Sequence, residues 1–344
     1  MPVALDLTPA ELASLLPGEP PFRMTQVWRG LHLGRAPMEM TDLPVGLRRR
    51  LATALPPGLA LGATSVNDAG DTTKWLWALP DGPAVETVLM HYPDRATVCV
   101  STQAGCAMAC GFCATGQAGF RRHLSAGEIV EQVVRARRAA LPRRLSNVVF
   151  MGMGEPLANY RPTWAAVERL HGDLAISARH ITVSTVGLVP GIRRLATERL
   201  PVNLAVSLHA ANDALRDELV PVNRRWPLGL LMEACQAWTE AKGRRLSFEW
   251  ALIDGINDRS ADAIELADLA RPLAAHVNLI PLNPTPGYPT RGTPAKSVRA
   301  FRDRLAALGV NATIRRNRGT DIDAACGQLA AIGAPARAKT PAGG

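Results

Sequence analysis

Polar and apolar positions change their pattern along the chain near residue 95. Beyond this point, short apolar runs typical of buried strands alternate with longer segments of helical periodicity. The strand-like runs cover residues 96–101, 147–151, 180–184, 202–208, 246–253, 277–281 and 310–315, and the helical segments cover 126–140, 164–174, 189–198, 228–242, 261–273 and 296–308. This alternation predicts a parallel sheet covered by helices, either doubly wound or closed as a full or partial β/α barrel. In all of these architectures, ligands bind at the carboxyl ends of the strands.

The pattern before residue 95 predicts a group of helices followed by short strands. Thr8-Pro9-Ala10-Glu11 is a helix-start signal, with a capping box and a proline at the first helical position. Helical periodicity continues over 22–33 and 43–51, and short runs over 60–92 are typical of β-strands. A second capping box, Ser125-Ala126-Gly127-Glu128, predicts the start of the first helix of the alternating part.

These patterns divide the chain into four expected parts. They are a small helical domain (1–58), a short β extension (59–94), an α/β core (95–330) and a flexible tail (331–344). We expect the tail to be loose because Ala, Pro and Gly dominate it.

The composition is that of a soluble globular protein. Apolar residues make up 47% of the chain, and no apolar run approaches the roughly 18 residues that a membrane span needs. The N-terminus lacks a basic start and carries Asp6 and Glu11, so we expect no signal peptide and a cytoplasmic location. Six cysteines in 344 residues are too few for a disulfide scaffold, and reduced thiols are available for metal binding or catalysis.

The charge balance is basic, at +9, and arginine supplies 35 of the 39 basic side chains. Arginine suits bidentate phosphate contacts, but arginine with abundant alanine also reflects codon usage in a G+C-rich genome. The excess gathers in residues 99–150 and 301–344, which codon usage does not predict, and this favours an anionic partner. The clustered arginines include Arg121, Arg122, Arg135, Arg137, Arg138, Arg143, Arg144, Arg302, Arg304, Arg315, Arg316 and Arg318.

Three cysteines stand close together in a glycine-rich loop after the first strand of the alternating part. Cys106, Cys110 and Cys113 can face one point, and no fourth cysteine follows closely. A structural zinc ion takes four ligands, and ordinary ferredoxin clusters take four thiolates. Three thiolates on a cubane cluster leave one iron open for a small molecule. Zinc stays open as an alternative at this point.

This loop, with Phe112 before the last cysteine, resembles the cluster motif of the radical S-adenosylmethionine (SAM) superfamily. The resemblance implies a [4Fe–4S] cluster held by Cys106, Cys110 and Cys113, whose open iron chelates the amino and carboxylate groups of SAM. One-electron reduction then cleaves the sulfonium and yields a 5′-deoxyadenosyl radical. It also implies a partial (β/α) barrel of the radical SAM type.

The longer string Arg95-Ala96-Thr97-Val98-Cys99-Val100-Ser101-Thr102-Gln103-Ala104-Gly105-Cys106 is similar to the dual-specificity RNA adenine carbon-2 methyltransferases, the RlmN family. The similarity runs from about residue 22 to residue 329. It implies two substrates, 23S ribosomal RNA at the peptidyl-transferase centre and transfer RNA at the adenine next to the anticodon. It further implies a one-electron reductant such as flavodoxin or ferredoxin, and we expect a monomer without a membrane partner. The helical domain would help to hold RNA, through Arg23, Arg29 and Arg48 to Arg50.

Several residues at or just beyond strand ends match the family's cofactor contacts. Without the resemblance, a glycine turn or a lone histidine is more often structural. The matching residues are Gly154, Glu155, Ser184, Ser207, Leu208, His209 and Asn283.

The resemblance assigns the remaining chemistry to Glu86, Cys99 and Cys326. Carbon 2 of adenine is electron-poor and carries a non-acidic hydrogen, so it cannot attack a sulfonium methyl group directly. In the family, a cysteine at the position of Cys326 is methylated by one SAM molecule, and a second SAM supplies the radical that activates the S-methyl group. The resulting carbon radical adds to the adenine and forms a transient protein–RNA adduct. Glu86 occupies the position of the proton acceptor, and Cys99 that of the thiol that releases the product through a transient disulfide with Cys326.

Two alternatives remain, and one cysteine has no assigned role. The sister activity methylates carbon 8 of adenine in 23S ribosomal RNA with the same thiols and cofactor, although the long N-terminal region favours carbon 2. A non-catalytic iron–sulfur or zinc protein that binds RNA is the alternative of another class, but it leaves Glu86, Cys99 and Cys326 without a purpose. Cys235 fits a helix and matches no family motif, so we assign it to packing.

Overall fold

The computed structural model describes residues 3–285, 287–315 and 318–331, and its centre is a ten-stranded sheet. The strands stand in the order β1-β2-β3-β4-β7-β8-β9-β10-β11-β12. Pairing is antiparallel from β1 to β4 and parallel for every neighbouring pair from β4 to β12. The strands are β1 (Ala60–Val66), β2 (Thr72–Ala78), β3 (Ala84–His91), β4 (Ala96–Cys99), β7 (Leu145–Phe150), β8 (Ile181–Thr185), β9 (Asn203–Ser207), β10 (Ser247–Leu252), β11 (His276–Pro281) and β12 (Ala312–Ile314).

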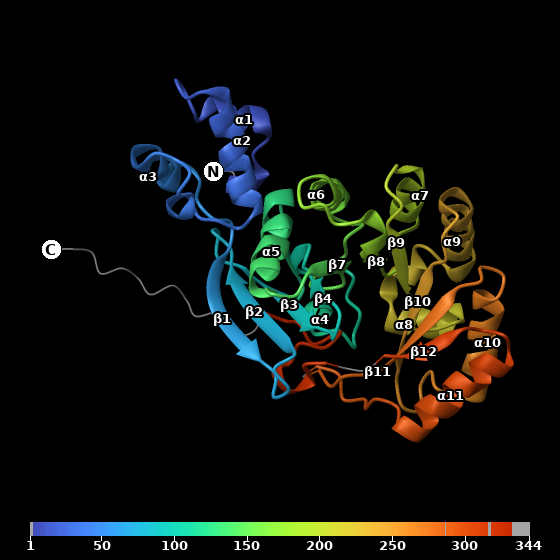
Figure 1. The fold of residues 1–344 in the computed structure, drawn as a ribbon. Coiled ribbons are helices and arrows are strands. Elements are labelled where there is room, and N and C mark those ends of the chain that lie inside the picture. Colours follow the sequence, from blue (N-terminus) through green and yellow to red (C-terminus); the bar gives the residue numbers. More distant parts are fainter. Residues whose placement is uncertain (1–2, 286, 316–317, 332–344) are drawn as a thin grey trace.

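Helices connect the parallel strands and cover the outer face of the sheet (Figure 1). They are α5 (Ala126–Ala139), α6 (Tyr160–Gly172), α7 (Val189–Thr197), α9 (Leu228–Lys242), α10 (Ser260–Ala270) and α11 (Ala295–Ala307). Apolar side chains from these helices and from the strands form one core cluster. Cys235 lies in that core on α9 and is fully buried, which confirms its assignment to packing.

The sheet curls into a partial barrel. Its strand order is linear, yet Met90 of β3, Cys99 of β4 and Asn278 of β11 line one cavity. Strands so far apart in the order meet only if the sheet curves back on itself. Residues 318–331 lie across the remaining opening, because they bond to β2 and β3 on one side and to Pro284 on the other. Of the architectures that the alternating pattern allowed, this confirms the partial β/α barrel that the family resemblance implied.

One β-hairpin and two short helices of the core were absent from the sequence prediction. The hairpin of β5 (Gln103–Gly105) and β6 (Phe120–His123) carries the loop with the three clustered cysteines. The short helix α4 (Ala114–Gln117) begins immediately after that loop, and α8 (Asp213–Leu219) follows β9. All three are too short for periodicity to reveal them.

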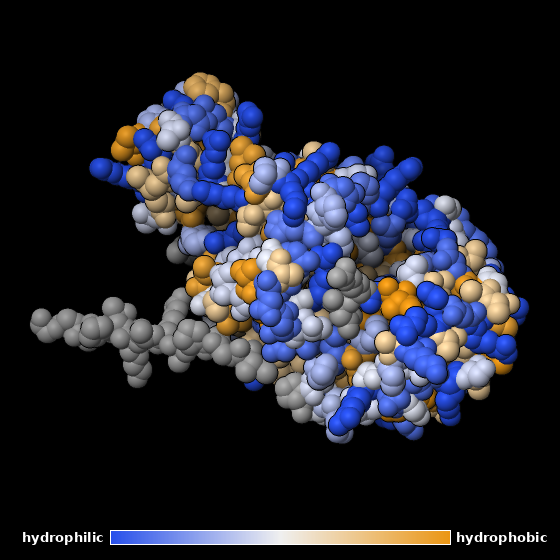
Figure 2. Space-filling model, turned by 60° about the horizontal axis from the view of Figure 1, so that its bottom comes forward, coloured by the Kyte–Doolittle hydropathy of each residue, from blue (hydrophilic) through white to orange (hydrophobic). Residues whose placement is uncertain are grey.

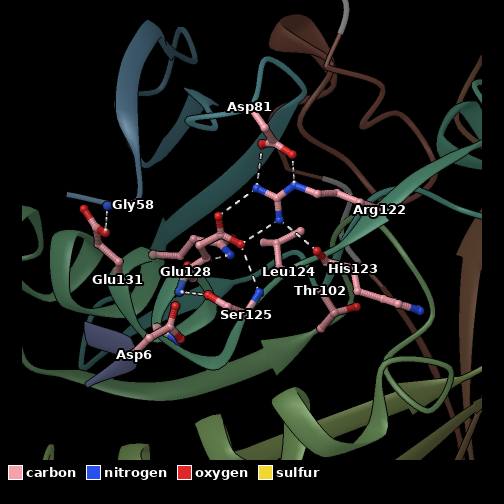
Figure 3. A network of polar contacts seen from close by, with 12 residues as sticks. Asp6, Gly58, Asp81, Thr102, Arg122, His123, Leu124, Ser125, Glu128 and Glu131 are labelled. Atoms are coloured by element: carbon pink, nitrogen blue, oxygen red, sulfur yellow. Dashed lines mark hydrogen bonds and ion pairs between the residues drawn. The ribbon is translucent and has the colours of Figure 1, made fainter. Parts of the chain in front are cut away.

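The N-terminal helices pack on α5 through a short 3₁₀ turn, Ala4–Asp6. They are α1 (Pro9–Ser14), α2 (Pro21–His32) and α3 (Val45–Ala54). Asp6 accepts a hydrogen bond from the Gly127 amide, and Glu131 accepts one from the Gly58 amide (Figure 3). Both predicted capping boxes are present, at Thr8 with Glu11 and at Ser125 with Glu128. The domain boundaries at 58 and 94 stay predictions, and residues 332–344 of the predicted tail lie outside the described residues.

Most of the arginines that cluster along the sequence do not gather at one place in the structure. Exposed Arg143 and Arg144 lie just before β7, next to His180 before β8, and therefore at the amino ends of the strands. Arg302 and Arg304 lie on α11, and Arg316 lies outside the described residues. Four others are bound to carboxylates of the chain itself: Arg122 to Asp81 and Glu128 (Figure 3), Arg135 to Glu131, Arg138 to Glu39, and Arg318 to Asp71. The clustered arginines are therefore spread over several parts of the fold, and some are engaged by the chain's own carboxylates.

Hydrophobic and hydrophilic residues are interspersed on the face in Figure 2, over the N-terminal lobe and the barrel alike. Among the large apolar side chains of the N-terminal helices, those of Phe22 and Val45 are the most exposed to solvent. Within the described ranges, none of the helices is both long and apolar enough to cross a membrane.

Candidate functional site

A cavity opens at the carboxyl ends of the parallel strands, where the alternating pattern placed the ligand site. All three clustered cysteines line it, together with residues that follow β7, β8, β9 and β11. Of the residues expected to hold cluster or cofactor, it is lined by Cys106, Cys110, Cys113, Gly154, Glu155, Ser184, Ser207, His209 and Asn283. Leu208 does not line it, because its side chain is fully buried in the core.

Two glycines let the cysteine loop fold tightly. Gly105 has a φ of 73°, and a Cβ built there would lie 1.7 Å from the Gly119 carbonyl oxygen of the paired strand end. Gly116 packs directly on the backbone of Cys110, where a Cβ would meet the carbonyl oxygen at 2.9 Å. Any larger residue at these two positions would push the hairpin and the loop apart.

The three thiols fit a cluster better than a single zinc ion. Among the described residues, no group of three His, Cys, Asp or Glu side chains could hold one metal ion. Zinc holds its thiolates about 2.3 Å from a single centre, whereas a cubane cluster takes each thiolate at a different iron. Burial raises the pKa of Cys106 to about 12 and also raises the pKa of Cys110. Thiolates at these positions therefore need a positively charged metal centre beside them.

Glu155 lies in a glycine turn directly beyond β7. Gly154 adopts a φ of 100°, and a Cβ there would lie 2.5 Å from the Cβ of Gln103. The Gln103 side chain accepts a hydrogen bond from the Glu155 amide at 2.8 Å. The Glu155 carboxylate in turn accepts bonds from the amides of Val186 and Leu157. Burial nevertheless raises the pKa of Glu155 to about 7, so the cavity favours a cationic group beside it.

His209 is a neutral part of the cavity wall. Its Nδ1 accepts a hydrogen bond from the Ala251 amide at 3.0 Å, which leaves the ring hydrogen on Nε2. Burial lowers the pKa of His209 to about 3, so the ring carries no charge at neutral pH. The edge of the ring meets Phe112 of the cysteine loop, with ring centroids 4.9 Å apart. His209 therefore joins the end of β9 to the cysteine loop rather than supplying a proton.

Arg216 of α8 holds the carboxyl ends of β8 and β9 together through hydrogen bonds. The sequence analysis did not identify this residue. Its buried guanidinium donates to the carbonyl oxygens of Val186, Ser207 and Leu208 and to the side chain of Asn223. Burial lowers the pKa of Arg216 to about 10, which still leaves it charged at neutral pH. The Asn212 cap of α8 was the only signal in the sequence.

A second cavity lies inside the barrel beside the first. Cys99 of β4 lines it, with Tyr92, Asn278 and the loop that carries Cys326. Met151, Arg315 and Cys326 line both cavities and thus form the wall between them. All six cysteines lie in the described part of the chain, and none forms a disulfide.

Arg315 in this wall and Glu249 of the first cavity carry opposite charges. The sequence analysis named Arg315 only among the clustered arginines and gave Glu249 no role. Glu249 lines the first cavity and accepts hydrogen bonds from Asn278 and Ser247. Burial raises the pKa of Glu249, while the nearby charge of Arg315 lowers it. The sulfur of Cys326 lies close enough to Arg315 to be the largest cause of a raised pKa of that guanidinium.

The loop that carries Cys326 is fixed from three directions. The Asn283 side chain donates to the Cys326 carbonyl oxygen at 3.0 Å. The Ala114 amide, beside the cysteine loop, donates to the Gly327 carbonyl oxygen at 2.8 Å. Arg318 binds Asp71 and the His91 carbonyl oxygen, which ties the start of the loop to the β extension.

Glu86 is buried on β3 and lines neither of the two cavities. Both of its carboxylate oxygens are engaged. Oε1 pairs with the Lys74 ammonium at 3.0 Å, and Oε2 accepts hydrogen bonds from the amides of Ala330 and Ala331. The structure therefore places the expected proton acceptor beneath the end of the Cys326 loop.

The chain is similar to known proteins over most of its length. Residues 100–267 match the model of the radical SAM superfamily. The chain is 53% identical to a protein of Chloroflexus aurantiacus described as a probable dual-specificity RNA methyltransferase RlmN, over 94% of this chain and 92% of that protein. A protein of Thermobifida fusca with the same description is 51% identical, over 96% of this chain and 94% of that protein.

The similarity extends to a solved structure. A radical SAM methyltransferase from Sphaerobacter thermophilus superposes with a TM-score of 0.92 at 51% identity. The match covers 96% of this chain and all of that one. The likeness therefore includes the N-terminal helices and the β extension as well as the barrel.

Proposed function

Because this chain belongs to the RlmN family of dual-specificity RNA methyltransferases, we propose that it methylates carbon 2 of adenine in 23S ribosomal RNA and in transfer RNA. The radical SAM superfamily uses a [4Fe–4S] cluster and SAM, which together supply a 5′-deoxyadenosyl radical. Such a radical suits this reaction, because carbon 2 is too electron-poor to attack a sulfonium methyl group. The chain's own residues then have to bind the cofactors, carry the methyl group and move one proton.

Cys106, Cys110 and Cys113 would hold the cluster in the first cavity. The carboxylate of Glu155 and the polar side chains of Ser184, Ser207 and Asn283 line the same cavity. They would bind the amino and carboxylate ends of SAM, with Gly154 allowing the close approach of the backbone. The raised pKa of Glu155 fits this role, because a buried carboxylate gains most from a cationic partner.

Cys326 would receive a methyl group and carry it to the adenine. One SAM molecule serves as methyl donor and a second as radical source, which gives two per turnover. Cys99 would then attack the Cys326 sulfur, so that the carbon–sulfur bond to the RNA breaks and a disulfide forms, while the product carbon takes the electron pair and the proton given up by Cys99. Before that attack, Glu86 would accept the proton that leaves carbon 2, and a one-electron acceptor such as the oxidised cluster would take the unpaired electron of the adduct.

One observation carries this proposal: Cys326 lies in the wall between the cysteine-loop cavity and the cavity that Cys99 lines. A sulfur in that wall can meet a methyl donor on one side and a second thiol on the other. A non-catalytic iron–sulfur or zinc protein would need no such pair of thiols.

We further propose that residues 1–58 form an RNA-contacting domain. Exposed Arg29, Arg49 and Arg50 lie on its helices and can reach phosphates. Arg23 and Arg48 donate to backbone carbonyl oxygens of the same region, so they offer less. A one-electron reductant such as flavodoxin or ferredoxin and a monomeric state complete the proposal.

Mass spectrometry of the protein and its RNA product tests the proposal. After anaerobic cluster reconstitution and turnover with SAM and a reductant, the peptide with Cys326 should carry a methyl group and the peptide with Cys235 none. Digestion of the RNA to nucleosides should yield 2-methyladenosine. Recovery of 8-methyladenosine would instead assign the sister activity, and an unmethylated Cys326 in active enzyme would remove it as the carrier.

A further inference from the structure

Lys74 forms a buried ion pair with the expected proton acceptor. The Lys74 Nζ lies 3.0 Å from Glu86 Oε1, and the two side chains are only 14% and 5% exposed. Lys74 lies opposite Val88 in the β2–β3 ladder, so Glu86 is its diagonal neighbour on the adjacent strand. Arginine supplies most of the basic side chains, and lysine stands at only four positions of the chain.

This ion pair holds the Cys326 loop on both sides of the cysteine. On the N-terminal side, the Lys74 Nζ donates to the Asp323 carbonyl oxygen at 3.2 Å. On the C-terminal side, Glu86 Oε2 accepts from the Ala330 amide at 3.0 Å and the Ala331 amide at 3.3 Å. The loop that carries Cys326, the proposed methyl carrier, is therefore tied to Glu86, the proposed base, both directly and through Lys74.

The same contacts distinguish the two oxygens of Glu86: Oε1 pairs with the Lys74 ammonium, and Oε2 already accepts from two backbone amides. Protonation of Oε1 would give up the ion pair with Lys74, so Oε2 is the oxygen left for the substrate proton, which has to take the place of one of the two amides. The two backbone amides belong to the end of the loop, whereas the ammonium is fixed on a strand. Movement of the loop end thus frees Oε2, while Lys74 keeps Oε1 in position.

We propose that Lys74 is a positioning residue that holds Glu86 and the Cys326 loop as one unit, and that Glu86 accepts its proton only when residues 330–331 leave Oε2. This inference rests on the proposed function. In the step concerned, the carbon 2–hydrogen bond breaks, its proton passes to Glu86, its electron pair stays with the RNA adduct, and the unpaired electron of the adduct passes to a one-electron acceptor such as the oxidised cluster. Methylation of Cys326 precedes that step and needs no base at Glu86.

The two halves of the reaction therefore respond differently to Lys74→Met. We expect S-methylation of Cys326 to stay within about twofold of wild type, because Asn283 and Ala114 still hold the loop at Cys326 and Gly327. Release of methylated RNA should fall by at least about tenfold, since a positioned general base contributes about 10²–10⁴-fold. The protein–RNA adduct should accumulate on denaturing gels in proportion. Lys74→Arg should restore most of the release, because it keeps the cation.

Hydrogen exchange of the purified protein gives a readout that does not depend on activity. The peptide over residues 319–331 should exchange faster in Lys74→Met than in wild type or in Lys74→Arg. Lys296→Met is the matched control, because Lys296 is exposed on α11 and its loss should change neither exchange nor release. If Lys74→Met does not fold, Lys74→Gln, which keeps a donor for Asp323 but no charge, replaces it.

The inference is overturned if Lys74→Met, or its Gln replacement, releases product at the wild-type rate without accumulating adduct. It is equally overturned if methylation and release fall together in a folded variant, because Lys74 would then act on the loop alone. Failure of the proposed function looks different: wild-type enzyme itself would show neither S-methylcysteine nor methylated RNA.

Discussion

Cys99 and Cys326 line the same cavity, Cys99 from a strand near the start of the barrel and Cys326 from the loop that lies across its opening. Burial raises the pKa of the Cys99 thiol to about 12, the nearby sulfur of Cys326 adds to the effect, and Arg315 acts in the opposite direction. At neutral pH, Cys99 is therefore a protonated thiol and a weak nucleophile. Such a thiol is protected against early disulfide formation with Cys326.

Substitution of single cysteines should distinguish the roles of Cys326, Cys99 and Cys235. Cys326→Ala should form neither S-methylcysteine nor an RNA adduct, whereas Cys99→Ala should accumulate the adduct and lose release of product by at least about 100-fold. Cys235→Ala, a control in the core, should keep activity and lose about 1 kcal/mol of stability. Mass spectrometry and denaturing gels follow the first two variants, and urea unfolding follows the third. Normal turnover by Cys99→Ala would remove Cys99 from the mechanism.

Iron content tests the cysteine loop. Anaerobic reconstitution of wild-type protein should yield about four irons and matching sulfide per chain. Cys110→Ala should retain far less iron, because a buried ligand is lost, while Cys235→Ala should match wild type. Iron and sulfide analysis with visible absorption measures both. One zinc per chain with no sulfide would contradict a cluster at this loop.

The buried Glu155 carboxyl should make stability depend on pH in the cofactor-free protein. Its pKa is raised from 4.5 to about 7, so the folded protein binds the proton more tightly than the unfolded chain. The contribution to the free energy of unfolding is therefore present below about pH 4.5 and is lost as the pH rises to about 7, by about 3 kcal/mol in total. Urea unfolding between pH 5 and pH 8 should show this slope relative to Glu155→Gln. Parallel curves for the two proteins would refute it.

SAM should reverse the effect, because its ammonium group gives the ionised carboxylate a partner. We expect SAM to stabilise the reconstituted wild-type protein more at pH 8 than at pH 5. Thermal unfolding with and without SAM measures this, and Glu155→Gln should show little stabilisation at either pH.

The turn before Glu155 should tolerate no side chain. Gly154→Ala combines a φ of 100° with a contact of 2.5 Å to the Cβ of Gln103, and we expect it to cost at least about 2 kcal/mol. Gly172→Ala is a matched control, because it lies at the end of α6 with nothing within 4 Å of the added Cβ. Alanine in a helix should stabilise the protein by up to about 1 kcal/mol. Equal stabilities of the two variants would show that the turn is not constrained.

Local patterns were sufficient for most elements of the fold. The alternation of apolar runs and helical periodicity predicted β4, β7 to β12 and the six connecting helices, because burial on both faces of a parallel sheet imposes this pattern. The capping boxes at Thr8 and Ser125 predicted two helix starts, since each uses only residues within one turn. The hairpin that carries the cysteine loop was missed, because pairing of three residues with four leaves no periodic signal.

The sequence by itself also determined which chemistry the chain can hold, since cysteine spacing in the loop is a local property and the family resemblance extends it to Glu86, Cys99 and Cys326. Only the tertiary structure decided which of these groups meet. The curl of the sheet brings Cys99 to Cys326, the loop end covers Glu86, and Arg216 connects strand ends from outside the recognised motifs. Most clustered arginines, in contrast, point to carboxylates or to the amino ends of the strands. Contacts between residues far apart in the sequence depend on how the sheet closes and on which charged side chains pair. Local sequence patterns reveal neither of these, because both involve residues on different elements.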